Sequence, residues 1–101
     1  VKGVAHITGG GFYENIPRVL PDNCRAHVDL RAYAPQPIFS LMAKKGGISR
    51  TEMYSTFNMG VGMVAVVPSQ EADKALKVLQ ENGQPTFLLG DIRAGEKGVT
   101  L

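Results

Sequence analysis

Three consecutive glycines, Gly9 to Gly11, constrain the fold of this 101-residue chain more than any other feature. They follow an apolar segment, Val4 to Ile7, and precede an amphipathic segment that begins at Phe12. Glycine loses more backbone freedom on folding than other residues, so a folded domain keeps such a run where the backbone bends sharply or approaches a ligand. A strand, a glycine loop and a helix start in this order direct several N–H groups toward one anion. The run therefore predicts a phosphate-binding loop.

Polar side chains on both sides of the glycines suit the same ligand. Thr8 offers a hydroxyl, Asn15 an amide and Arg18 a guanidinium whose donors match phosphate oxygens. For Arg18 the alternative role is an ordinary surface ion pair. His6 is either a general acid or base, a phosphate donor, or a histidine that is hydrogen-bonded at a strand end and holds the loop.

The loop matches neither of the two best-known phosphate-binding patterns. No Gly-Lys-Ser/Thr follows it, so it is not a Walker A loop, and the spacing Gly-x-Gly-x-x-Gly is absent. The alternative to a phosphate site is a glycine-rich turn without a ligand, and the residues alone leave both open.

Composition and charge indicate one globular domain over residues 1–101, with 44% hydrophobic and 20% charged residues. A net charge of +2 with scattered basic residues argues against nucleic acid as a partner. No apolar run approaches the roughly 18 residues of a membrane span, so no membrane contact is expected. Cys24 has no second cysteine for a disulfide or a zinc site, and no cluster of histidines and carboxylates predicts a metal.

The apolar periodicity predicts a mixed α/β (α+β) fold, a β-sheet with helices packed on it. Strands are expected at 2–7, 25–30, 63–67, 86–92 and 99–101, the last pairing beside 86–92. The continuous apolar run at 63–67 predicts a central strand covered on both faces.

Helices are expected at 12–20, 37–45 and 49–57, and a last one is expected to end at Gly83. Pro17 limits or kinks the first helix. The second is expected to bury Ile38, Leu41 and Met42. Ser49 begins a capping box for the third, and Ser69 caps the last.

Two long motifs carry a family resemblance. The first is His-Ile-Thr-Gly-Gly-Gly-x-x-x-Asn-Ile-Pro-Arg-Val-Leu-Pro at 6–21, and the second is Glu-Met-Tyr-Ser-Thr-Phe-Asn-Met-Gly-Val-Gly-Met at 52–63. A softer match, Leu-Leu-Gly-Asp-Ile, lies at 88–92. Over essentially its whole length the chain resembles the C-terminal domain of the aminoimidazole ribonucleotide synthetase family, the phosphoribosylformylglycinamidine cyclo-ligases.

The resemblance implies a cytoplasmic two-domain enzyme of purine biosynthesis that is about three times longer than this chain. The chain itself begins with Val1 rather than Met, as expected of the C-terminal part of such an enzyme. The family's fold is a mixed sheet with packed helices, partly similar to a ferredoxin-like arrangement. The N-terminal domain is expected to bind ATP and Mg²⁺ and to form most of a homodimer contact. The substrate is expected to be formylglycinamidine ribonucleotide, and this domain alone is expected to be inactive.

The resemblance also implies which residues face the substrate. The glycine loop lines a cleft between the domains and holds either the substrate's 5′-phosphate, which we favour, or a phosphate transferring from ATP. Asn58 joins the site with Gly60 and Gly62, where glycine indicates a close backbone approach. Alternatively, Asn58 caps the preceding helix in a left-handed conformation.

Two other functions are compatible with the residues. One is a related ATP-using enzyme, of the formylglycinamidine synthetase, selenophosphate synthetase, thiamine-phosphate kinase or hydrogenase-maturation type. The other is a non-catalytic module that binds phosphate or a nucleotide. The presence of both long motifs favours the cyclo-ligase.

Overall fold

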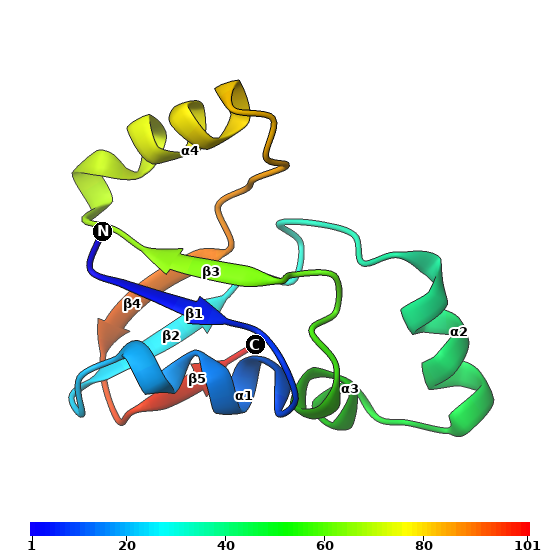
Figure 1. The fold of residues 1–101 in the computed structure, drawn as a ribbon. Helices are drawn as coiled ribbons and strands as arrows, with labels where there is room; N and C mark the ends of the chain where they lie inside the picture. Colours follow the sequence, from blue (N-terminus) through cyan, green and yellow to red (C-terminus); the bar gives the residue numbers. More distant parts are fainter.

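The computed structural model describes all of residues 1–101 and has strands and helices in mixed order (Figure 1). The strands are β1 (Gly3–His6), β2 (Cys24–Val28), β3 (Met63–Val66), β4 (Gly90–Ala94) and β5 (Gly98–Thr100). The helices are α1 (Gly11–Asn15), α2 (Pro37–Gly46), α3 (Arg50–Thr56) and α4 (Ala72–Glu81). Two 3₁₀ turns, η1 (Pro17–Val19) and η2 (Ser69–Glu71), complete the order. The α+β class predicted from the sequence is confirmed.

The strands form two sheets rather than one. β1 pairs antiparallel with β3, and β2 lies between β4, which runs antiparallel to it, and β5, which runs parallel. The expected pairing of 99–101 beside 86–92 is therefore wrong. Ala26 of β2 lies opposite Ile92 of β4 and opposite Val99 of β5. The apolar face of β2 therefore packs beside apolar residues of both neighbouring strands.

The prediction of a central, doubly covered strand at 63–67 is also wrong. β3 has β1 as its single partner, and its side chains alternate between exposed and half-buried. Met63 is 64% exposed, whereas Val64 packs against the core. A continuous apolar run does not reveal how many strands will flank it, because its neighbours come from distant parts of the chain.

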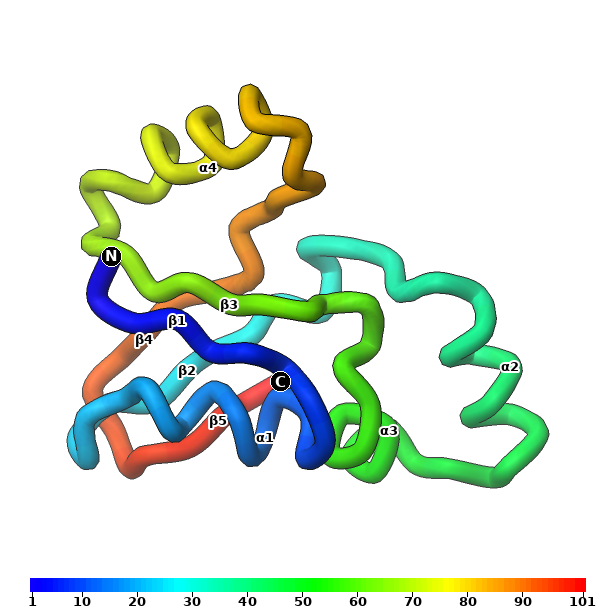
Figure 2. The backbone as a smooth tube through the Cα atoms, in the orientation of Figure 1, coloured from blue at the N-terminus to red at the C-terminus, as the bar shows by residue number.

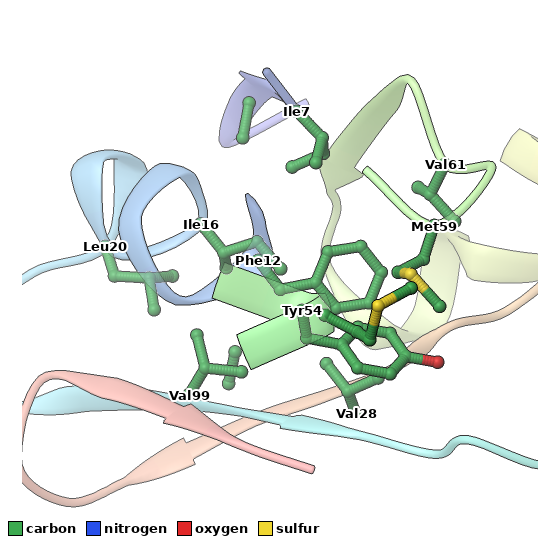
Figure 3. Close-up of a cluster of buried hydrophobic side chains, with 12 residues drawn as sticks. Ile7, Phe12, Ile16, Leu20, Val28, Tyr54, Met59, Val61 and Val99 are labelled. Atoms are coloured by element: carbon green, nitrogen blue, oxygen red, sulfur yellow. The ribbon is translucent and has the colours of Figure 1, made fainter. Parts of the chain in front are cut away.

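The core is built by side chains of both sheets and of the helices α1 and α3, which pack together (Figure 3). The Phe12 side chain of α1 is fully buried, and its ring centroid is 5.1 Å from that of Tyr54 in α3. Strands of both sheets add Ala5, Ala26, Val28 and Val99, and the remaining core residues are Ile7, Ile16, Leu20, Met53, Met59 and Val61. Ile7, two positions before the glycine run, and Phe12, directly after it, therefore belong to the core.

Proline ends the first helix earlier than its apolar spacing predicts. α1 stops at Asn15, and Pro17 begins the 3₁₀ turn η1 instead of kinking a longer helix. A proline has no N–H to donate to the preceding turn and its ring crowds the carbonyl four residues before it, and at Pro17 this ends the α-helix.

Of the two predicted caps, one is confirmed and one is wrong. The Ser49 hydroxyl accepts a hydrogen bond from the Glu52 N–H at 3.2 Å, as a capping serine should. Ser69 instead begins the turn η2, and α4 starts at Ala72 without a side-chain cap.

α2 and α4 lie at the periphery and contribute no buried residue (Figure 1). The stripe predicted for α2 is wrong in part, because Ile38 and Leu41 are about half exposed while Phe39 and Ala43 pack against the core. None of the helices combines the length and the apolar character needed to cross a membrane.

Candidate functional site

The two sequence motifs meet in space beside the glycine loop. The Ile7 N–H donates to the Gly62 carbonyl oxygen at 2.9 Å, which ties the end of β1 to the segment before β3. A Cβ atom at Gly11 would overlap the carbonyl oxygen of Tyr54 and crowd that of Phe57. In Figure 2 the loop after β1 lies beside the chain that leaves α3. Residues some fifty positions apart therefore build one surface.

The backbone of the loop forms a tight, left-handed turn. Gly10 and Gly11 have φ angles of 96° and 59°, which side chains rarely allow. The Gly11 N–H closes the turn by donating to the Thr8 carbonyl oxygen at 3.0 Å. The N–H groups of Thr8, Gly9 and Gly10 donate to no acceptor in the protein. Gly9 is exposed, and a Cβ added to it would touch nothing within 4 Å.

Asn15 lies underneath this loop rather than at its surface. Its Nδ2 lies 2.8 Å from the carbonyl oxygen of Gly11 and 3.2 Å from those of Thr8 and Gly9. Its Oδ1 accepts from an Arg18 guanidinium nitrogen at 3.2 Å. The amide expected to contact phosphate is thus engaged within the loop, because a buried amide needs partners for its donors.

The second motif forms a turn that its own side chains stabilise. The Asn58 Oδ1 accepts from the Gly60 N–H at 2.8 Å. The left-handed residues here are Met59 and Gly60, with φ angles of 54° and 88°. Asn58 is therefore not a left-handed helix cap, and that alternative is wrong. Its side-chain oxygen is occupied by the turn, as the amide of Asn15 is by the loop.

A family model described as AIR synthase related protein, C-terminal domain, matches residues 1–101. The chain belongs to this family. The resemblance predicted from the two motifs is confirmed.

Curated relatives that this chain matches are named phosphoribosylformylglycinamidine cyclo-ligase. The proteins of Alkaliphilus oremlandii and Lachnospira eligens are each 48% identical over 101 residues, which is all of this chain and 30% of each relative. The protein of Bifidobacterium longum is also 48% identical over 101 residues, 29% of its length. The chain therefore spans about 30% of the length of these relatives.

Three further predicted site residues lie at the surface. Thr8 is exposed, and its hydroxyl has no partner in the protein. Arg18 is exposed and takes part in none of the ion pairs, so the surface ion pair considered for it is absent. The exposed His6 imidazole makes no hydrogen bond to the protein, so it does not hold the loop in place.

Tyr33 is a residue of this domain that the sequence did not single out. Its hydroxyl donates to the Met59 carbonyl oxygen at 3.1 Å, and its ring stacks on Phe87 with centroids 4.8 Å apart. Burial raises the pKa of the Tyr33 phenol well above its usual value, and the neighbouring Tyr54 raises it further. Tyr33 thus stabilises the turn of the second motif through its hydrogen bond to Met59. No local pattern marks it, because both partners are distant in the sequence.

Two surface cavities of this chain lie away from the glycine loop. A cavity of about 460 Å³ lies on the three-stranded sheet, and one of about 230 Å³ lies between α2 and α3. Beside the larger cavity, the guanidinium groups of Arg31 and Arg93 pair with Asp29 and Asp91 and lower the pKa of both carboxyls. Its arginines are therefore already paired with carboxylates, so the sequence prediction of an anion site at the loop is not replaced by one here.

The domain brings together no group of three side chains that could hold a metal ion. Mg²⁺ prefers carboxylate and water oxygens, whereas the loop offers N–H donors. The loop therefore suits an oxyanion and not a cation.

Proposed function

We propose that this chain is the phosphate-anchoring part of an ATP-dependent cyclo-ligase. The full protein would convert formylglycinamidine ribonucleotide to aminoimidazole ribonucleotide in the cytoplasm, in de novo purine biosynthesis. The name of its relatives supports the reaction. One observation carries the role of this chain: the adjacent N–H groups of Thr8, Gly9 and Gly10 lack acceptors within the protein.

The loop has the chemistry that a ribonucleotide 5′-phosphate requires. Neutral backbone donors stabilise a phosphate without a counter-charge. Gly9 has open space where a side chain would stand, so a phosphate oxygen can approach its backbone. Arg18 uses one guanidinium nitrogen for Asn15 and keeps other donors for a phosphate oxygen.

Glu14 limits how the phosphate enters. Its carboxylate lies beside Gly10, where it repels a second anion. The side chain is exposed, so it has room to turn outward when phosphate binds. Replacing Glu14 by glutamine removes the repulsion and is expected to tighten phosphate binding.

In this proposal the chain holds and orients the substrate, and other residues activate it. ATP supplies the phosphoryl group that turns the formamide oxygen into a leaving group. The phosphoryl transfer leaves ADP. The amidine nitrogen then attacks the carbon of the formamide, the bond from that carbon to the phosphorylated oxygen breaks, and the imidazole ring closes as inorganic phosphate and a proton leave. An anchored phosphate favours this step, because fixing the substrate lowers the entropic part of the barrier. His6, whose imidazole is exposed and unpartnered two residues before Thr8, is the residue here that would transfer a proton.

The open position of the loop supports a second domain as part of the site. Thr8 and Gly9 are exposed, so a phosphate bound there would gain further walls from elsewhere. The relatives are about three times longer than this chain. We therefore assign ATP, Mg²⁺ and most of a homodimer contact to an N-terminal domain.

Blocking the loop without straining it tests the proposal. Inorganic phosphate and a ribonucleoside 5′-monophosphate are titrated into the chain and into Gly9→Val by calorimetry. Valine has room at this position and would cover the donors, so we expect binding at least about tenfold weaker than wild type. Gly95→Val is the control, because Gly95 lies in the turn between β4 and β5, away from the loop (Figure 2). If the Gly9 and Gly95 variants bound phosphate with equal affinity, the glycine loop would not be the phosphate site.

A further inference from the structure

Asn15 is the one buried polar side chain of the protein, with 3% of its surface exposed. The sequence suggested a ligand contact, but its amide faces the interior side of the loop. It gathers the carbonyl groups of Thr8, Gly9 and Gly11 around one nitrogen. A buried amide with this many partners determines the orientation of the backbone around it.

The orientation of the carbonyls determines that of the donors. In a trans peptide unit the C=O and the following N–H point in opposite directions, and no peptide bond of this chain is cis. The Thr8 carbonyl points at Asn15, so the Gly9 N–H points away from it. By the same geometry, the Gly9 carbonyl points at Asn15 and the Gly10 N–H points away from it. Both N–H groups lack a protein acceptor.

We infer that Asn15 is a positioning residue for the anion site: it holds the loop carbonyls inward and thereby aims the Gly9 and Gly10 N–H groups at the ligand. The inference rests on the proposed function only for the identity of that ligand, a phosphate group. The orientation of the loop itself does not depend on it.

The chemistry of the side chain explains why asparagine stands here. Leucine has a similar size but no donors, and aspartate would direct negative oxygens at three carbonyl groups. Arg18 donates to the Asn15 Oδ1, so the oxygen end of the amide faces Arg18 and the NH₂ end faces the loop. Arg18 therefore also acts through Asn15.

Amide NMR of the ¹⁵N-labelled chain, with inorganic phosphate as the probe, tests this role. We expect phosphate to shift the Gly9 and Gly10 amide signals of the wild type. We expect Asn15→Leu to keep a dispersed, folded spectrum but to bind phosphate at least about tenfold more weakly. The matched control is Asn82→Leu, which removes an amide-to-carbonyl bond of 2.7 Å to Val78 far from the loop and should bind as wild type. Unchanged affinity in folded Asn15→Leu would overturn the inference.

Hydrogen exchange without phosphate separates this inference from the proposed function. In the wild type, the Asn15 side-chain NH₂ should exchange slowly and the Gly9 and Gly10 N–H groups rapidly. This pattern would support the role of Asn15 even if the wild type bound no phosphate, a result that refutes only the proposed ligand. Because this exchange pattern is measured on the wild type, it would still test the positioning role of Asn15 if Asn15→Leu failed to fold. Slow exchange of the two glycine amides would contradict the inference whatever binds.

Discussion

The three adjacent glycines are glycine for three different reasons. Gly9 has a free space above it, Gly10 has a left-handed φ of 96°, and Gly11 combines a φ of 59° with backbone contact to α3. An added Cβ is therefore harmless to the fold at the first position. At the third it would collide with the backbone of Tyr54, which cannot move aside as a flexible side chain can.

Alanine at these positions separates folding from binding. We expect Gly11→Ala to lower the free energy of unfolding by more than about 2 kcal/mol, because left-handed backbone strain and the collision with Tyr54 add. Gly9→Ala should change it by less than about 1 kcal/mol. Urea unfolding followed by circular dichroism measures both. Similar losses in the two variants would contradict the described loop geometry.

At the scale of the element, α3 links the second motif to the loop. Its start is capped by Ser49, and the backbone near its end contacts Gly11. A helix of seven residues is too short to be stable alone, so its cap and its packing matter together. The cap of α3 should therefore contribute to the stability of the surface that carries the loop.

Two serines at helix starts test this link. Ser49→Ala should lower the free energy of unfolding by about 1 kcal/mol, since it leaves the Glu52 N–H without its acceptor. Ser69→Ala is the matched control, because its side chain caps nothing, and it should stay within about 0.5 kcal/mol of wild type. Denaturant midpoints together with the slopes of the unfolding transitions give both free-energy changes. A loss at Ser69 equal to that at Ser49 would show that the cap is not the cause.

At the scale of the whole molecule, one small core carries both sheets. Twelve hydrophobic residues are buried in it, and α2 and α4 supply none of them. Phe12 lies at its centre, directly after the glycines, and contacts Tyr54 of the second motif (Figure 3). The loop therefore depends on global folding as well as on its own turn.

Truncating the central ring is expected to affect the entire fold. Phe12→Ala should cost about 3–5 kcal/mol, which approaches the roughly 5 kcal/mol total of a marginal domain. Thermal unfolding should show a large fall in midpoint or no transition at all. Leu88→Ala, at a position 61% exposed, should leave the midpoint nearly unchanged. A wild-type midpoint in Phe12→Ala would place the core elsewhere.

Much of the local structure follows from residues close together in the chain. The turn at the glycine run, the cap at Ser49 and the alternation along β2 depend on backbone freedom, one short hydrogen bond and a period of two. The two motifs were enough to identify the family. The signal for each of these features lies in residues close together in the chain, so the sequence by itself was enough to predict them.

Other features depend on which distant residues meet, and only the tertiary structure decided them. The position of β2 between β4 and β5, the single partner of β3 and the brace from Tyr33 all join segments far apart in the sequence. Asn15 is the clearest case. Its residue type predicted a polar contact, but burial under the loop turned its amide toward backbone carbonyls. A side chain's chemistry is local, whereas its partners are set by packing.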